Sequence, residues 1–527
     1  MKQNIPSLIQ SIHCQFAFLK QAASLEALFV RNLNLPACGG VLLPVAEIHR
    51  EDAATSVLLP VAEWLNDAAR IAFLVLNRQQ RLVGAFGLTR HGDLSLSLFV
   101  ISGDRDDTVL REAAFALAKW AEDTLFVEKV KAGDSNSSVF WDSAGFTAGI
   151  FQSPQARTAG QNLILTAGPS ISPREAAYAF DAAKYGWNKE WSKYLTRFEQ
   201  DFAAFVGAKH AMACSSGTGA LTIALTALDI GPGDEVIVPD LTWVATANAV
   251  RYVGATPIFA DIELDTWNMD VKSAEACVTP RTKAIMPVHM YGHPARMDGI
   301  MALARKRGLY VVEDAAPAIG AEWQGQRCGS FGDFAAFSFQ GAKLLVTGEG
   351  GMLVCSNPQL YEKALKIWDQ GRNPNKTFWI DGHGLKYKMA NCQAALGLGQ
   401  LERCAELVAM KRRVFGWYVE GLQDVPGVHL NFEAAGAFSI YWMSSLRLDE
   451  TVPISRNDLI AELKKRNVDT RPVFPAISQY PIWGREIIPQ PTALRVSQQA
   501  INLPSGVCLR REQVAYVCRQ IREILSA

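Results

Sequence analysis

The chain has 527 residues, more than one domain usually contains, and its apolar content predicts two or three domains with substantial cores. Its 52 Lys and Arg residues balance its 52 Asp and Glu residues, and no basic run stands out, which argues against nucleic acid or a membrane surface as a bulk partner. Ten scattered cysteines without metal-ligand spacing, no export signal and no apolar run of about 18 residues predict reduced thiols, no metal site and a cytoplasmic location.

Residues 1–155 have the pattern of a small α/β domain. Apolar runs with strand character alternate with turn residues, and one segment has helical periodicity. The expected strands are 70–77, 81–90, 94–102 and 127–133, and the expected helix is 107–126. The stretch 151–175 is rich in Ser, Pro, Gly and Gln, which is typical of a linker, and we expect the linker itself at residues 156–167.

Residues 168–400 alternate helical segments with short apolar strands. This alternation predicts a largely parallel sheet that is covered on both faces and collects ligand-binding groups at its strand ends. The expected strands are 210–216, 235–240, 256–261, 284–290, 310–316, 334–339 and 350–355. A long helix over 391–422 leads into residues 401–527, for which we expect a smaller α+β lobe.

A turn of small polar residues follows the first of these strands and opens a helix. Ser216, Gly217 and Thr218 would present backbone N–H groups and hydroxyls at the helix N-terminus, where the helix dipole favours an anion such as a phosphate. An N-cap without a ligand is the alternative reading of the same turn.

Three further residues become informative through their order. Asp314 ends a buried strand, where its carboxylate would hold a protonated ring nitrogen or cap a helix. Ser338 and Lys343 follow in "FSFQGAK". A lysine beside apolar walls becomes a nucleophile for a carbonyl, whereas most lysines are solvated surface charges.

These features follow one another along the chain: first the turn that would bind a phosphate, then the aspartate at a strand end, and then the serine and the lysine. This is the arrangement that pyridoxal phosphate requires. The phosphate is held at a helix start, the ring nitrogen by a carboxylate and the aldehyde as an imine on a lysine. Trp243, which follows the strand 235–240, would stack on the pyridine ring, although a core tryptophan is an equal reading.

The chain from residue 168 onward resembles DegT-type nucleotide-sugar aminotransferases, which have the aspartate aminotransferase fold (fold type I). The resemblance rests on motifs in the family's order: "GPSISPRE", "FEQDFAAFVGAKHAMACSSGTGAL", "GPGDEVIVPDLTWVATANAV", "PVHMYGHPARMD", "VVEDAAPAIGA", "FGDFAAFSFQGAKLLVTGEGGML" and "GLKYKMANCQAALGLGQLE". It implies a seven-stranded, mainly parallel sheet, a small C-terminal lobe and a homodimer with shared active sites.

Carried over position by position, the resemblance makes Lys343 the Schiff-base lysine, Asp314 the partner of the pyridine nitrogen and Trp243 the stacking residue. The phosphate would be held by Ser216, Gly217, Thr218 and Ser338.

Two departures from the family pattern stand out. In "GLKYKM" Lys386 replaces an asparagine that reaches the phosphate in the neighbouring subunit, and Lys388 replaces an arginine; a longer cation still meets a phosphate. Pro317 stands where relatives have a polar residue near the ring hydroxyl, and it can donate nothing.

The stretch 369–389 resembles perosamine synthases, which act on a GDP-linked 4-keto-6-deoxy sugar. The resemblance therefore implies transfer of an amino group from glutamate to a nucleotide-linked keto sugar, for a surface polysaccharide or a secondary metabolite. Expected pocket residues are Trp187, His289, Arg372 and Arg471, the arginines for a diphosphate or a donor carboxylate; structural ion pairs are an equal reading.

Residues 118–146 resemble the end of a Gcn5-related acetyltransferase domain. Three aspartates in "SGDRDDTVLRE" would repel an anionic coenzyme, and Trp141 stands where many members have a tyrosine. A catalytically silent front domain is favoured, with a bifunctional aminotransferase and N-acyltransferase as the alternative. A non-catalytic binding or regulatory protein is the remaining hypothesis, and Pro317 is its only support.

Overall fold

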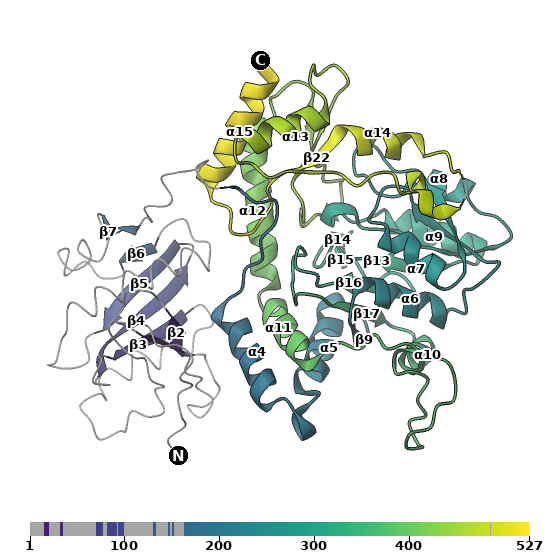
Figure 1. The fold of residues 1–527 in the computed structure, drawn as a ribbon, viewed down its shortest axis with the longest axis horizontal. Coiled ribbons are helices and arrows are strands. Elements are labelled where there is room, and N and C mark those ends of the chain that lie inside the picture. The colour runs from purple at the N-terminus through teal and green to yellow at the C-terminus, as the bar shows by residue number, and fades with distance from the viewer. Residues whose placement is uncertain are drawn as a thin grey trace. The chain divides into compact units, whose positions relative to one another are not determined.

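In this computed structural model the described residues are 163–526 apart from Arg485, together with eight strands between residues 15 and 151. Contacts divide the chain into two units, residues 1–158 with 170–177 and residues 159–169 with 178–527 (Figure 1). The domain boundaries expected from the sequence stay predictions.

The strands of the first unit form one sheet with the order β2-β1-β3-β4-β5-β6-β8-β7, in which only β5 and β6 pair in parallel. Strands lie at all four expected places. The expected helix 107–126 and Trp141 fall outside the described residues, so the acetyltransferase resemblance stays a prediction. The strands are β1 (Gln15–Leu19), β2 (Asn32–Asn34), β3 (Arg70–Leu76), β4 (Leu82–His91), β5 (Asp93–Phe99), β6 (Val130–Ala132), β7 (Phe146–Thr147) and β8 (Ile150–Phe151).

The second unit is built on a seven-stranded sheet with the order β11-β10-β12-β13-β16-β17-β9. Only β17 runs in the opposite direction to the other six strands, so the predicted mainly parallel sheet is confirmed. Each of its strands is buried along most or all of its length, which explains their nearly continuous apolar sequences. The strands are β9 (His210–Cys214), β10 (Glu235–Pro239), β11 (Thr256–Ala260), β12 (Thr282–Ile285), β13 (Tyr310–Asp314), β16 (Phe334–Ser338) and β17 (Gly351–Cys355).

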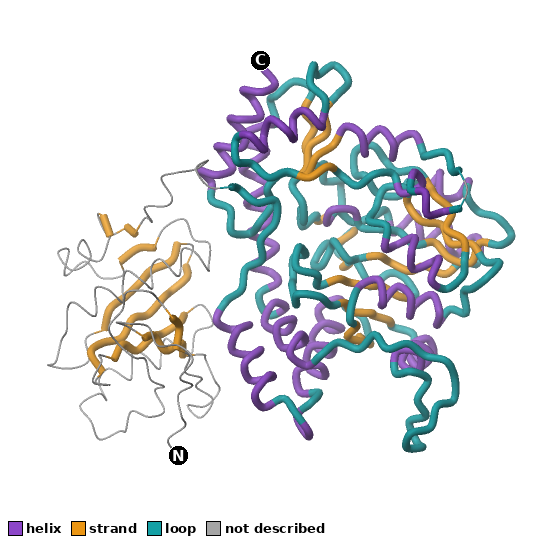
Figure 2. The backbone as a smooth tube through the Cα atoms, in the orientation of Figure 1, coloured by secondary structure: helices purple, strands orange, loops and turns teal. Residues whose placement is uncertain are grey.

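Helices cover both faces of this sheet (Figures 1 and 2). One face packs on α6 (Gly217–Ala227), α7 (Ala245–Tyr252) and α10 (Pro358–Trp368), and their apolar side chains share one core with the strands. The other face packs on α5 (Lys193–Val206), α8 (Val271–Ala276) and α9 (Met297–Arg307). The aromatic contact between Phe202 of α5 and Phe337 of β16, with ring centroids 4.9 Å apart, joins helix and sheet there.

A smaller α+β lobe follows, as predicted. Its antiparallel sheet has the order β18-β20-β22-β21 and packs against three helices. The helix expected over 391–422 is interrupted between residues 401 and 404 and forms α11 and α12. The elements are α11 (Asn391–Leu401), α12 (Cys404–Leu422), β18 (Val428–Leu430), β20 (Ser445–Leu448), α13 (Arg456–Lys465), β21 (Arg471–Pro472), α14 (Pro491–Gln499), β22 (Ala500–Asn502) and α15 (Arg511–Ser526).

The remaining elements are one helix near the start of this part of the chain and several short turns and strands. They include α4 (Pro173–Tyr185), the 3-10 turns η4 (Asn188–Glu190), η5 (Met290–Gly292), η6 (Ile477–Gln479) and η7 (Pro481–Trp483), and a small sheet of β14 (Glu322–Trp323), β15 (Gln326–Arg327) and β19 (Ala437–Phe438). The eight cysteines among residues 163–526 form no disulfide. No helix among the described residues is long and apolar enough to cross a membrane.

Candidate active site

The carboxyl ends of β9, β10, β13 and β16 meet at one edge of the sheet, because these strands run in the same direction. A cavity of about 400 Å³ lies at this edge. Seven residues predicted from the sequence line it together, although they come from segments more than a hundred residues apart. These are Ser216, Gly217, Thr218, Trp243, Asp314, Ser338 and Lys343.

The turn between β9 and α6 forms one wall. Ser216 is the N-cap of α6, and its hydroxyl accepts a hydrogen bond of 3.0 Å from the N–H of Gly219. Gly217 lies so close to β16 that a Cβ there would be 3.1 Å from the Cβ of Ser338. Glycine at this position lets the turn approach the strand end without displacing β16, and the first N–H groups of α6 and two hydroxyls gather at one place.

Asp314 ends β13 at the floor of the cavity and is only 5% exposed. Its Oδ2 accepts a hydrogen bond of 2.7 Å from the Thr246 hydroxyl, and its Oδ1 accepts one of 3.2 Å from the N–H of Ala316. Burial raises the pKa of Asp314, while the Thr246 hydrogen bond and the charge of Lys343 act in the opposite direction. A cation beside this carboxylate would therefore be strongly favoured.

Lys343 lies in the turn that follows β16. Burial lowers the pKa of its amine from 10.5 to about 8, and the negative charge of Asp314 limits that decrease. The amine Nζ lies 4.1 Å from the ring centroid of Trp442, which also lines the cavity. Near neutral pH a usable fraction of this amine is uncharged, as a nucleophile requires.

Two aromatic side chains, Trp243 and Phe474, form the opposite wall, with ring centroids 5.6 Å apart. Trp243 remains 57% exposed, so its ring has a face available to a ligand.

Phe474 belongs to a strap, residues 473–480, which the fully buried Asp240 holds to the end of β10. The Asp240 carboxylate accepts hydrogen bonds of 2.8 Å from both the N–H and the hydroxyl of Ser478, and one of 2.9 Å from the N–H of Gln490. The strap therefore keeps Phe474 at a fixed place on the wall.

Residues 169–522 match the family described as the DegT/DnrJ/EryC1/StrS aminotransferase family. The chain belongs to this family. The GDP-perosamine synthase of Caulobacter vibrioides is 39% identical over 367 residues, which are 69% of this chain and 98% of that protein. The putative pyridoxal phosphate-dependent aminotransferase EpsN of Bacillus subtilis is 35% identical over 321 residues, 60% of this chain and 82% of the relative.

Among solved structures, S. venezuelae DesV in complex with a ketimine intermediate aligns with a TM-score of 0.63 and 33% identity, over 67% of this chain and 95% of its own. The DegT-type resemblance and its fold, expected from the sequence, are confirmed for this part of the chain.

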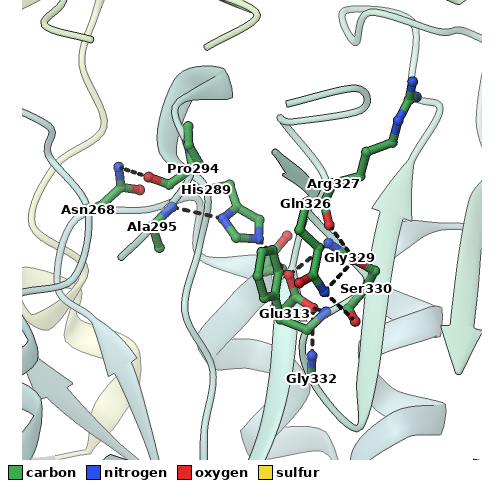
Figure 3. A network of polar contacts seen from close by, with 12 residues as sticks. Asn268, His289, Pro294, Ala295, Glu313, Gln326, Arg327, Gly329, Ser330 and Gly332 are labelled. Carbon is green, nitrogen blue, oxygen red and sulfur yellow. Dashed lines mark hydrogen bonds and ion pairs between the residues drawn. The ribbon is translucent and has the colours of Figure 1, made fainter. Parts of the chain in front are cut away.

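His289, expected in the substrate pocket, is fully buried and lies in a network of polar contacts with Glu313 (Figure 3). Its Nδ1 accepts a hydrogen bond of 3.0 Å from the N–H of Ala295, so its proton is on Nε2, which donates to Glu313 over 3.0 Å. Glu313 also accepts three backbone hydrogen bonds of 2.7 to 2.8 Å, from Gly329, Phe331 and Gly332. Since both ring nitrogens are engaged, His289 supports the end of β13 rather than facing the cavity.

Four other residues that we expected in the site lie on the surface and do not line the cavity. They are Trp187, Lys386, Arg372 and Arg471. The Trp187 indole donates to the carbonyl of Ala183, and the two arginines form ion pairs with Asp369 and Asp469. These ion pairs support the interpretation that the two arginines have a structural role within one chain.

Lys388, at the family's arginine position, also has partners within the chain. Its amine lies 2.5 Å from the Asp369 carboxylate and 4.2 Å from the ring centroid of Trp368. These contacts fix the loop around Lys386, which pairs with Asp369 through a β-bridge.

Sequence reasoning missed Trp442 and Phe474, which line the cavity, and Thr246, which donates a hydrogen bond to Asp314. Thr246 had a weak signal, since it lies one turn after Trp243 at the start of α7. Trp442 and Phe474 come from the lobe, and no local pattern connects them to Lys343.

Proposed function

We propose that the protein is a pyridoxal phosphate-dependent aminotransferase that moves an amino group from glutamate to the keto group of a nucleotide-linked 4-keto-6-deoxy sugar. The observation that carries this proposal is the meeting of the Lys343 amine and the Asp314 carboxylate in one cavity, beside the N-terminus of α6.

The residues present fit this cofactor. The Gly217 turn, where a Cβ would be crowded against β16, and the hydroxyls of Ser216, Thr218 and Ser338 would hold the phosphate. Asp314 would hold the protonated ring nitrogen, and the exposed face of Trp243 would cover the ring. Bound there, the cofactor would serve as an electron sink that stabilises negative charge at the carbon from which a proton leaves.

Lys343 would have two roles. Its uncharged amine would bind the cofactor covalently, for which the pKa of about 8 is suitable. Released from that bond, its Nζ would take up the proton that leaves the α carbon of the amino donor and release it again within the cavity. Asp314 would remain ionised throughout.

The substrate class rests on the relatives rather than on the cavity alone. Similarity to GDP-perosamine synthase over nearly that whole protein supports a 4-keto-6-deoxy sugar carried by GDP. Arg372 and Arg471 are exposed and carry charge suited to a diphosphate or to the donor's carboxylate.

We further propose a homodimer with shared sites, in which Lys386 reaches the cofactor phosphate of the partner subunit. The support is its position in the family motif and its exposure: its side chain lies outside the cavity of its own chain.

The test begins with pure full-length protein and pyridoxal phosphate. We expect a visible absorption band that disappears on addition of glutamate, and borohydride should fix the cofactor on Lys343. Lys343→Arg should abolish the band, whereas Lys363→Arg, at an exposed ion pair, should retain it. Mass spectrometry with a panel of nucleotide keto sugars should then show one aminated product; an unchanged band with glutamate, or no product, would overturn the proposal.

A further inference from the structure

The amine of Lys343 has a neighbour that the proposed function leaves unused. Its Nζ lies 4.1 Å from the ring centroid of Trp442. A cation over the face of an indole is stabilised by the ring's electron distribution, most strongly where water is excluded. The contact therefore stabilises the protonated lysine and leaves the neutral amine nearly unaffected.

Trp442 is held in this orientation from two sides. Its indole N–H donates a hydrogen bond of 2.7 Å to the carbonyl of Ala342, the residue before Lys343. Its own carbonyl accepts one of 2.7 Å from the buried amine of Lys411, which also donates to Ser505 over 2.6 Å. The ring further packs on Tyr291, with centroids 5.8 Å apart. The tryptophan is only 5% exposed, so its ring is a fixed part of the cavity wall.

We propose that the indole face of Trp442 is the resting place of the Lys343 amine whenever this amine is not bonded to the cofactor, and that it favours the protonated form there. The inference rests on the proposed function for its significance, because only there does the lysine alternate between a bonded and an unbonded state. A protonated amine over the Trp442 ring remains inside the cavity. It can bond to the cofactor again only after it has lost its proton.

The pKa of Lys343 also depends on the charged groups around it, so their effects must be separated from that of Trp442. The negative charge of Asp314 on β13 favours the protonated amine. Glu349, which lines the cavity from the turn before β17, is also an acidic residue. Lys411 lies behind Trp442 and would oppose protonation. Burial opposes it as well. Removing the aromatic face leaves these influences in place, so the pKa of Lys343 should fall.

The test measures this pKa in cofactor-free, full-length protein labelled with ¹³C at the lysine ε carbons. The signal that disappears in Lys343→Arg identifies the residue, and its shift is followed against pH. We expect Trp442→Leu to lower the midpoint by about one pH unit, which corresponds to ~1.4 kcal/mol and lies within the range of a partly desolvated cation–π contact. Trp442→Phe, whose ring is a weaker partner, should lower it by less.

Trp243→Leu is the matched control, because it removes an indole from the same cavity that packs on Phe474 instead of lying under the amine. It should leave the midpoint unchanged. An unchanged midpoint in Trp442→Leu would overturn the inference; if that variant does not fold, an unchanged midpoint in Trp442→Phe would do the same. Because no cofactor is present, this outcome is independent of the absorption assay that tests the proposed function.

Discussion

The hydroxyl of Thr246 donates a hydrogen bond of 2.7 Å to Oδ2 of Asp314, and both side chains are buried. The donor comes from the first turn of α7 and the acceptor from the end of β13, so two elements determine the orientation of one carboxylate. A hydrogen bond to the ionised form keeps a buried carboxylate charged, which is what a protonated ring nitrogen would need opposite it.

Thr246→Val should therefore weaken binding of pyridoxal phosphate. The isosteric change removes the hydrogen bond and raises the pKa of Asp314 further, so we expect about 10-fold lower affinity, since a hydrogen bond to a charged group contributes about 1.5–3 kcal/mol. Absorption titration of the cofactor-free protein measures this. Thr226→Val, which removes a hydroxyl bonded to the Thr222 carbonyl at the far end of α6, is the control; equal affinities of the two variants would contradict the prediction.

Association of the cofactor should depend on pH through Lys343. Its pKa is lowered to about 8, so the amine is mostly protonated at pH 7 and mostly neutral at pH 9. Only the neutral amine attacks an aldehyde, so the rate constant for appearance of the visible band should rise with pH and reach half its maximum near pH 8. Stopped-flow absorption checks this, and a midpoint above 10, the range of an ordinary lysine, would contradict it.

If the two subunits share their active sites, dimers that combine two different inactive variants should regain activity. Lys343→Ala should inactivate the site of its own chain, and Lys386→Ala should weaken the site of the partner, so one site of each mixed dimer carries both lesions and the other carries none. Unfolding and refolding equal amounts of the two variants together should restore about a quarter of the wild-type activity, because half of the dimers are mixed and each has one intact site. Activity no higher than that of the separate variants would show that Lys386 acts within its own chain.

Lys411→Met should destabilise the fold, because the carbonyls of Trp442 and Ser505 both lose a buried donor. We expect about 2–3 kcal/mol from two such hydrogen bonds. Burial lowers the pKa of Lys411 from 10.5 to about 7, so between these values the unfolded chain binds more protons than the folded chain. Stability contributed by this residue therefore rises with pH across that window.

The loss caused by Lys411→Met should accordingly be larger at pH 9 than at pH 7.5. Urea unfolding at both values measures the difference. Lys363→Met, at an exposed ion pair with Asp229, should cost less than about 1 kcal/mol and show no such trend. Equal losses for Lys411→Met at the two pH values would mean that the amine keeps its proton when buried.

The seven strands of the large sheet were predictable because burial on both faces makes them continuous apolar runs, as in β10 and β13. The meeting of Lys343, Asp314 and the turn 216–218 in one cavity was predictable because each lies next to a strand end, and parallel strands bring those ends together. Trp442 and Phe474 were not, since their approach to Lys343 depends on how the lobe packs. The burial of His289 was missed for a related reason, because its partner Glu313 was not distinguished from the neighbouring Asp314.

The strap that carries Phe474 is attached to the sheet through backbone groups, the Asp240 carboxylate and the Ser478 hydroxyl. None of these attachments involves the phenylalanine ring itself. The ring itself packs on Trp243 and Tyr291, with centroids 5.6 and 5.4 Å away, so a smaller side chain in its place would widen the cavity at the loss of these two contacts. Because the hydrogen bonds of Ser478 to Asp240 do not depend on this ring, a substitution at position 474 would change the shape of the cavity while the strap stays attached to the sheet.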